Sequence, residues 1–187
     1  MNLFVWFQGF FRMSRYLAYV RIFVSTTQGD FHEMAIRFEQ TMAVCCVRPL
    51  LDGVQSSNRS KLQESLIGTG FPFRDFKHLD TYMGMFKDMV KKTSGIRRPG
   101  AAALDLAYVA AGWLDGFWEI NLSAWDIAAG GLLIQEAGGI VGDFEGNETW
   151  LDTGNIVAGN PKVFAQMLQT LEPHLTEELR SNYQAQK

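Results

Sequence analysis

Cysteine and histidine are scarce in this chain of 187 residues. The two cysteines, Cys45 and Cys46, are adjacent, and the three histidines are scattered along the chain. Neither residue type therefore has the spacing of a zinc site or of a disulfide framework. Reduced thiols are the expectation, as is usual for a cytoplasmic protein.

Strong charge and long apolar runs are missing as well. The formal net charge is -3, and the basic residues form only short pairs, so the sequence predicts no nucleic-acid surface. The apolar residues 1–11 have no basic flank before them, and Arg12, Arg15 and Arg21 follow. A membrane span needs about 20 apolar residues, so we expect neither a span nor a signal peptide. Cytoplasmic location is the expectation.

The composition that remains, 47% hydrophobic and 20% charged, is typical of a globular protein. Residues 1–56 show no sustained periodicity and are left unassigned. From 57 to 175, helical spacing alternates with short strand-like segments, which predicts an α/β layered domain. Residues 176–187 are a polar tail. Helices are expected over 75–92, 101–111, 125–136 and 161–168, and strands over 117–120, 140–141 and 155–159. Asp115-Gly116 is interpreted as a turn.

Asp126 stands at the start of the apolar run 125–136. A buried carboxylate is costly unless a cation or hydrogen-bond donors compensate its charge. Two interpretations stay open at this point. Asp126 is either an acid that caps the helix, or a hard oxygen ligand for Mg²⁺.

Two further places in the sequence also allow both a structural and a functional interpretation. Glu119, at the end of the preceding strand, is either a surface acid or an acceptor for a substrate hydroxyl. Gly100, Ala101 and Ala102 open the helix over 101–111 from a loop. Such small residues let a ligand approach the N–H groups of a helix start, although a well-packed helix start needs nothing more.

Several segments, in order and spacing, are similar to the C-terminal half of the inositol monophosphatase family, and most of all to its bacterial inositol-1-monophosphatase branch. They are Gly68-Thr69-Gly70-Phe71-Pro72 and residues 97–110, 115–119, 125–130, 136–139 and 154–161. The resemblance runs from about Ser57 to Leu171.

The resemblance implies a Mg²⁺-dependent phosphatase with a layered αβαβα sandwich, present here mainly as its C-terminal half, and commonly a homodimer. Asp126 matches the metal ligand of that half and is the catalytic candidate. Glu119 matches the acid that binds substrate hydroxyls, while Gly100, Ala101 and Ala102 match the segment that lines the inositol site. The family usually has Ser or Thr at position 101, so a hydroxyl contact is lost here.

The larger departure lies upstream. The family places a Glu-Glu pair and an Asp-Pro-(Ile/Leu)-Asp-Gly-Thr motif in its N-terminal half, and neither occurs in this sequence. Asp52-Gly53 imitates the second motif, but Arg48 and Val54 replace its first Asp and its Thr. We therefore expect weak Mg²⁺ binding and little or no activity from this chain alone. The alternatives are a truncated, non-catalytic binding or dimerisation partner, and a phosphatase of sugar bisphosphates or 3′-phosphonucleotides.

Overall fold

The computed structural model describes residues 5–13, 16–24, 54–72 and 76–181, and Asp52-Gly53 lies outside them. The chain forms two compact units, Met1–Gly53 and Val54–Lys187. In the first unit, strands β1 (Val5–Met13) and β2 (Tyr16–Val24) pair in antiparallel register. All the candidate site residues belong to the second unit.

The second unit is built on a mixed sheet of five strands. They are β3 (Leu66–Thr69), β4 (Gly95–Arg97), β5 (Gly116–Glu119), β6 (Ile140–Gly142) and β7 (Ile156–Gly159). Their order in the sheet is β4-β3-β5-β7-β6. Strand β3 runs parallel to both of its neighbours, whereas β7 is antiparallel to β5 and to β6.

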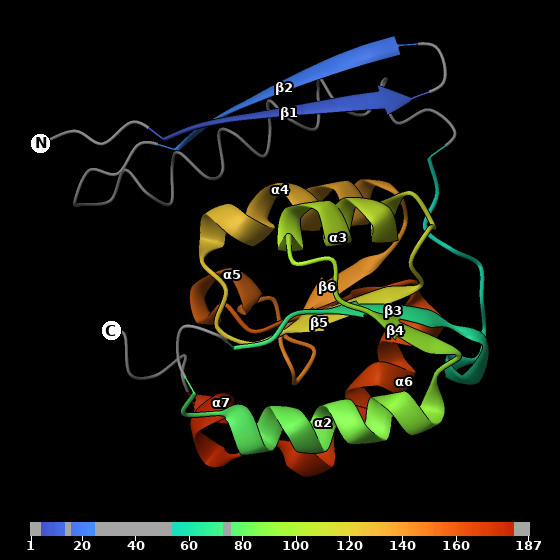
Figure 1. The fold of residues 1–187 in the computed structure, drawn as a ribbon, viewed down its shortest axis with the longest axis vertical. Coiled ribbons are helices and arrows are strands. Elements are labelled where there is room, and N and C mark those ends of the chain that lie inside the picture. Colours follow the sequence, from blue (N-terminus) through green and yellow to red (C-terminus); the bar gives the residue numbers. More distant parts are fainter. Residues whose placement is uncertain (1–4, 14–15, 25–53, 73–75, 182–187) are drawn as a thin grey trace, which may run out of the picture. The chain divides into compact units, whose positions relative to one another are not determined.

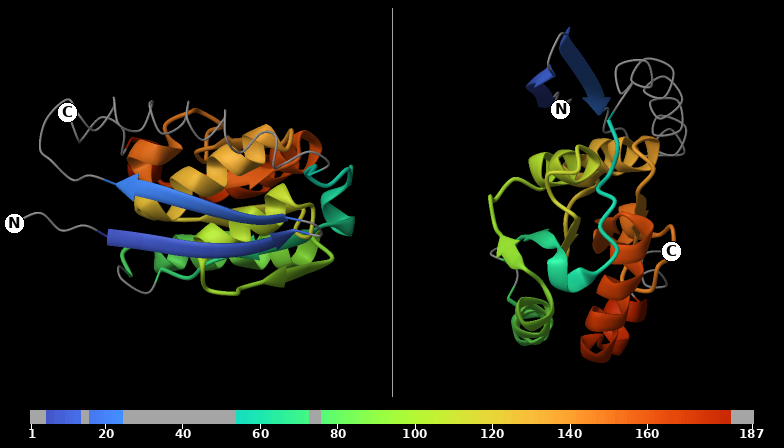
Figure 2. Two further views of the ribbon diagram at one scale, coloured as in Figure 1. Left: turned by 90° about the horizontal axis from the view of Figure 1, so that it is seen from above. Right: turned by 90° about the vertical axis from the view of Figure 1, so that its right-hand side faces the viewer.

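Helices cover both faces of this sheet (Figures 1 and 2), with α3 and α4 on one face and α2 and α6 on the other. The helices are α2 (Leu79–Lys92), α3 (Ala102–Ala110), α4 (Ala124–Glu136), α5 (Trp150–Thr153), α6 (Pro161–Leu171) and α7 (Glu177–Ser181). Short 3₁₀ turns occur at η2 (Leu62–Glu64) and η3 (Glu172–His174). The predicted layered α/β class is confirmed, and none of the described helices is long and apolar enough to cross a membrane.

Successive side chains of the central strands alternate between two separate hydrophobic cores. Phe117 packs in the core beneath α3 and α4, and its neighbour Trp118 packs in the core beneath α2 and α6. Ile156 and Val157 divide in the same way on β7. This is the two-residue period of a strand buried on both faces, and it places Glu119 on the α3/α4 side.

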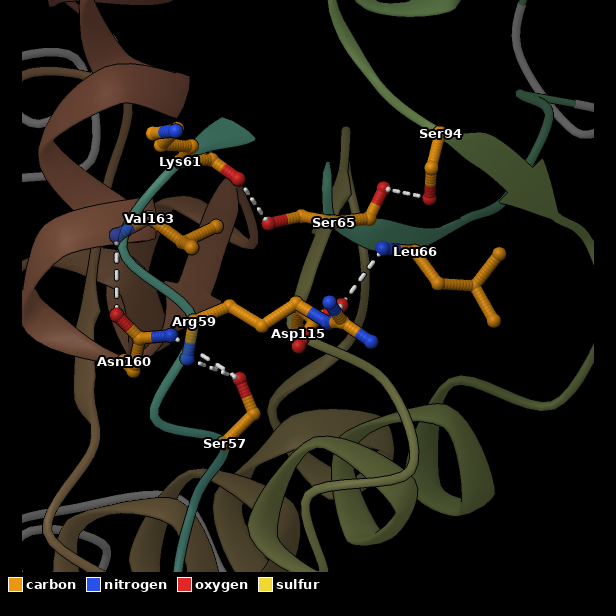
Figure 3. Close-up of polar contacts among 9 residues, drawn as sticks. All are labelled: Ser57, Arg59, Lys61, Ser65, Leu66, Ser94, Asp115, Asn160 and Val163. Carbon is orange, nitrogen blue, oxygen red and sulfur yellow. Dashed lines mark hydrogen bonds and ion pairs between the residues drawn. The ribbon is translucent and has the colours of Figure 1, made fainter. Parts of the chain in front are cut away.

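Residues 54–65, which we call the strap, are tied to the rest of the second unit by side-chain hydrogen bonds (Figure 3). The Asn160 Nδ2 donates to Ser57 Oγ at 3.1 Å. The same side chain caps α6, because its Oδ1 accepts the N–H groups of Lys162 and Val163 at 3.0 Å each. Further along the strap, the Leu62 N–H donates to the Gln166 side chain on α6.

Asp115 and Gly116 do not form the predicted turn, and that interpretation was wrong. Gly116 is the first residue of β5. Asp115 is buried, and its Oδ2 accepts the Leu66 N–H at 2.7 Å and lies 3.4 Å from Arg59 Nε (Figure 3). An Asp-Gly pair is a common turn signal, but here the aspartate joins two parallel strands to the strap.

The segment 176–187, which the sequence presents as a polar tail, begins with the short helix α7. Leu179 on this helix is buried in the core beneath α2 and α6. Glu178 and Arg180 on the same helix form ion pairs with Lys77 and Glu145, so polar contacts hold α7 as well.

Candidate active site

Glu119 ends strand β5 and is the most perturbed carboxylate of the site. Its pKa is raised from 4.5 to about 7. Burial is the largest cause, the negative charges of Asp105 and Asp126 act in the same direction, and the Arg98 guanidinium opposes them. Three acidic side chains and one basic side chain therefore interact electrostatically at the carboxyl end of β5.

Gly70 gives the Glu119 side chain its space. A Cβ atom at this position would lie 2.1–2.3 Å from the carboxyl atoms of Glu119. Any larger residue at position 70 must push the carboxyl group away. Beside it, the Arg98 guanidinium lies over the Phe71 ring, 5.7 Å from the ring centre. The Gly70-Phe71 segment thus forms one wall against the acid and the cation together.

Asp126 is the third residue of α4 and is partly buried. Its Oδ2 accepts the backbone N–H of Ser123 at 3.3 Å. The capping interpretation therefore has direct geometric support. It does not displace the other interpretation, since a carboxylate has a second oxygen and further lone pairs.

Gly100, Ala101 and Ala102 lie where α3 begins. Gly100 has a φ of +91°, in the region that favours glycine, and Ala101 is the N-cap residue in an extended conformation. Ala101 has no side-chain oxygen, so the N-cap residue itself cannot accept the N–H groups of the first turn of α3. Gly100 and Ala101 are exposed. The start of α3 is consequently open to a ligand that accepts hydrogen bonds.

Asp105 is a candidate that the sequence analysis missed. Its side chain is 1% exposed, and within the described residues its Oδ1 has no hydrogen-bond partner. Burial raises its pKa to about 6, while a hydrogen bond from the Ala101 backbone and the charge of Arg98 lower it. A single acid inside an alanine-rich helix was the available signal, because such a helix buries most of its faces.

The predicted residues thus lie together at one end of the α3/α4 face, but they do not complete a metal site. Within the described ranges, no group of three or more His, Cys, Asp and Glu side chains could hold a metal ion. Mg²⁺ is usually held by one or two protein carboxylates together with waters and substrate phosphate. Asp126 fits as one such carboxylate, and the described residues do not supply the rest.

A comparison with protein families identifies the family of this chain. The model of the inositol monophosphatase family matches residues 42–177. The chain belongs to this family. The match begins upstream of Ser57, so it includes the end of the segment that the sequence analysis left unassigned. Members of the inositol monophosphatase family are generally phosphatases that use Mg²⁺.

Individual relatives agree with the family assignment. The chain is 57% identical over 126 residues to the Nus factor SuhB of Pseudomonas aeruginosa, an alignment covering 66% of this chain and 46% of that protein. The solved structure of extragenic suppressor protein suhB from Bartonella henselae is 43% identical with a TM-score of 0.63 and covers 65% of this chain and 47% of that one. Inositol monophosphatase from Anabaena is 38% identical with a TM-score of 0.61, covering 64% and 49%.

The chain therefore spans about half the length of the inositol monophosphatase relatives that it matches. The layered fold and the C-terminal family motifs are both present. The described residues include the candidates Asp126 and Glu119.

Proposed function

We propose that this chain carries the C-terminal half of the active site of a Mg²⁺-dependent phosphomonoesterase that hydrolyses inositol 1-phosphate to inositol and phosphate. The observation that carries the proposal is the convergence of Asp126, Glu119 and the open start of α3 at one end of the sheet. Family membership supports the reaction class, and the name of the Anabaena relative supports inositol as the alcohol.

Each residue has a role that suits its surroundings. Asp126 is the metal ligand that this half contributes. Glu119 accepts a hydroxyl of the substrate, and the partial burial that raises its pKa also strengthens such a hydrogen bond. The backbone at Gly100, Ala101 and Ala102 presents the uncapped start of α3 to the polyol.

We expect the activity of this chain alone to be weak or absent. An incomplete ligand set binds Mg²⁺ poorly, and the loss of one positioned charge-stabilising group costs about 10²–10³ in rate.

Sugar bisphosphates and 3′-phosphonucleotides remain the alternative substrates, because the described residues contain no contact that distinguishes their hydroxyl patterns. A substrate panel at one Mg²⁺ concentration ranks them directly.

The test is phosphate release from myo-inositol 1-phosphate over a range of Mg²⁺ concentrations, with Asp126→Asn as the variant. The matched control is Asp152→Asn, an exposed acid in the first turn of α5. Release that Asp126→Asn abolishes and Asp152→Asn preserves supports the proposal. Release that survives Asp126→Asn contradicts the role of Asp126. Thermal melting of both variants shows whether Asp126→Asn also destabilises the helix start. An unchanged melting temperature means that only the metal ligand is lost.

A second candidate function is non-catalytic. The relatives named Nus factor SuhB favour it. In this case the chain acts as a binding or dimerisation partner, and the exposed Trp125 beside the site is a contact residue. A folded chain that releases no phosphate at any Mg²⁺ concentration supports this function over the first. Light scattering coupled to size-exclusion chromatography then tests dimerisation, and a monomer at all concentrations removes the homodimer.

A further inference from the structure

Helix α2 carries a line of exposed apolar side chains. Of the seven large apolar side chains that are exposed in the described part of the chain, three lie on this line. They are Phe76, Met83 and Val90, which are 65%, 47% and 50% exposed. Helix α6 covers the same face of the sheet (Figure 1), and it has no exposed side chain of this kind. The line is therefore a property of α2 and not of the whole helical layer.

The spacing along this line is that of a helix that packs lengthwise on another helix. Phe76, Met83 and Val90 are seven residues apart, and the half-buried Leu79 and Phe86 lie three residues after the first two. Steps of three and four residues thus alternate, as they do in a heptad repeat. Phe76 lies in the turn before α2, where its C=O accepts the Leu79 N–H at 3.0 Å. We call these five residues the α2 seam.

The α2 seam is separate from the side of the helix that faces the core. That buried side is formed by Tyr82, Met85 and Met89. Scattered single apolar residues are ordinary on a protein surface, whereas contiguous ones mark an interaction site. The α2 seam is contiguous, so it calls for a partner.

Two charged residues border the α2 seam on its exposed side. Asp80 and Lys87 each follow a seam residue by one position, and both are exposed. Neither forms an ion pair within the described ranges, whereas Lys91 on the same helix pairs with Asp88 at 3.2 Å. Two opposite charges beside an apolar seam are consequently available to a partner.

The positions of these charges favour a second copy of α2 in antiparallel orientation. About a two-fold axis beside Met83, Phe76 faces the partner's Val90 and Met83 faces the partner's Met83. Asp80 lies three residues before Met83, and Lys87 lies four residues after it. The same axis therefore brings Asp80 opposite the partner's Lys87, twice in each dimer. A parallel pair of helices would instead place like charges opposite each other.

We propose that the α2 seam is a homodimer interface, formed by antiparallel packing of α2 on the α2 of a second copy. The proposal rests on the homodimer of the second candidate function and assigns the surface that forms it. Because the seam spans only two heptads, we expect a weak dimer with a dissociation constant on the order of 1–100 µM. No residue of the α2 seam takes part in the proposed phosphatase site.

The first test is sedimentation equilibrium of the full chain between about 1 µM and about 1 mM. Met83→Glu places two like charges at the two-fold axis, and we expect dimerisation to weaken by about a hundredfold or more. Leu104→Glu is the matched control, because Leu104 is 45% exposed on α3. We expect this control to dimerise like the wild type.

Charge reversal tests the orientation of the two helices. Asp80→Lys or Lys87→Asp alone creates two repulsive pairs, and we expect each to weaken dimerisation roughly tenfold, a difference of about 1.4 kcal/mol. The variant that carries both changes has opposite charges facing each other again, so we expect it to regain the wild-type affinity. Circular dichroism checks that each variant is folded. If Met83→Glu unfolds the chain, the charge reversals carry the test.

Three outcomes would overturn the proposal. A wild-type chain that stays monomeric at all concentrations removes the homodimer itself. A dimer that Met83→Glu leaves unchanged is formed by another surface, and the homodimer of the second candidate function then stands without this interface. Single reversals without effect, or a double variant that does not recover, exclude the antiparallel arrangement. Phosphate release is a separate measurement, so none of these outcomes bears on Asp126 or Glu119.

Discussion

At the scale of single residues, the candidate active site contains carboxylates in two different settings. Glu119 and Asp105 are held where burial disfavours their charged forms. Asp126 is partly buried and receives a backbone N–H. Buried acids with raised pKa values are typical of functional sites. The stability of the protein must therefore depend on pH through these acids.

We predict that stability falls as the pH rises from about 4.5 to about 7. The unfolded chain releases the Glu119 proton near the ordinary pKa of 4.5, whereas the folded chain holds it until about pH 7. The folded state thus binds more protons in this window, and its advantage is lost as the pH rises through it. Urea unfolding at pH 5 and pH 8 measures the loss, which we expect to be on the order of 2 kcal/mol.

Glu119→Gln isolates the contribution of this group. We expect the variant to lose clearly less stability between the two pH values, with a remainder due to Asp105. Glu148→Gln, at an exposed position, is the control and keeps the wild-type difference. Identical pH profiles for wild type and Glu119→Gln would show that Glu119 does not carry the effect.

At the scale of elements, helices were easier to predict than strands. The spacing of apolar residues located α2, α3, α4 and α6, because each buries a continuous side over at least two turns. Strand β4 has three residues and carries no pattern that alternation could reveal. For Asp105, its position in an alanine-rich helix was a signal of burial, but the degree of burial was not predictable. It depends on how α3 packs against α4 and β5, which no local pattern specifies.

The start of α3 offers a direct test at this scale. We predict that Ala101→Ser stabilises the protein by about 1 kcal/mol, because a serine oxygen can accept an N–H of the first turn. In a domain of this size that corresponds to about 2–4 °C in melting temperature. Ala103→Ser, two residues further into the helix, is the control and is expected to be neutral or slightly destabilising. Equal effects of the two changes would argue against an uncapped helix start.

At the scale of the whole molecule, both hydrophobic cores belong to the unit Val54–Lys187. The order and spacing of motifs were sufficient to predict the family and the layered fold. The strap was not predictable, because its hydrogen bonds join residues about a hundred positions apart. Ser57 and Leu62 find their partners on α6 only after the chain has folded back.

We predict that a fragment of residues 54–187 folds cooperatively, while one of residues 66–187 is much less stable. The shorter fragment lacks the strap, which removes the Ser57 hydroxyl from Asn160 and the Arg59 guanidinium from Asp115. Thermal unfolding followed by circular dichroism compares the two. An unfolded 54–187 fragment would mean that residues 1–53 are needed for the fold, and equal melting temperatures would mean that the strap contributes nothing.

The strap also has a consequence for synthesis on the ribosome. Its residues leave the exit tunnel before the rest of the second unit, yet Asn160 and Gln166, which hold it, are made near the end. Until then the sheet can pair β3 with β4 and β5, but it cannot add β7. The first segment of the second unit to be translated is thus among the last to be fully anchored. A ribosome that stalls before α6 holds a nascent chain in which β6, β7 and the strap lack their partners, and apolar surface exposed in this way is a target for chaperones.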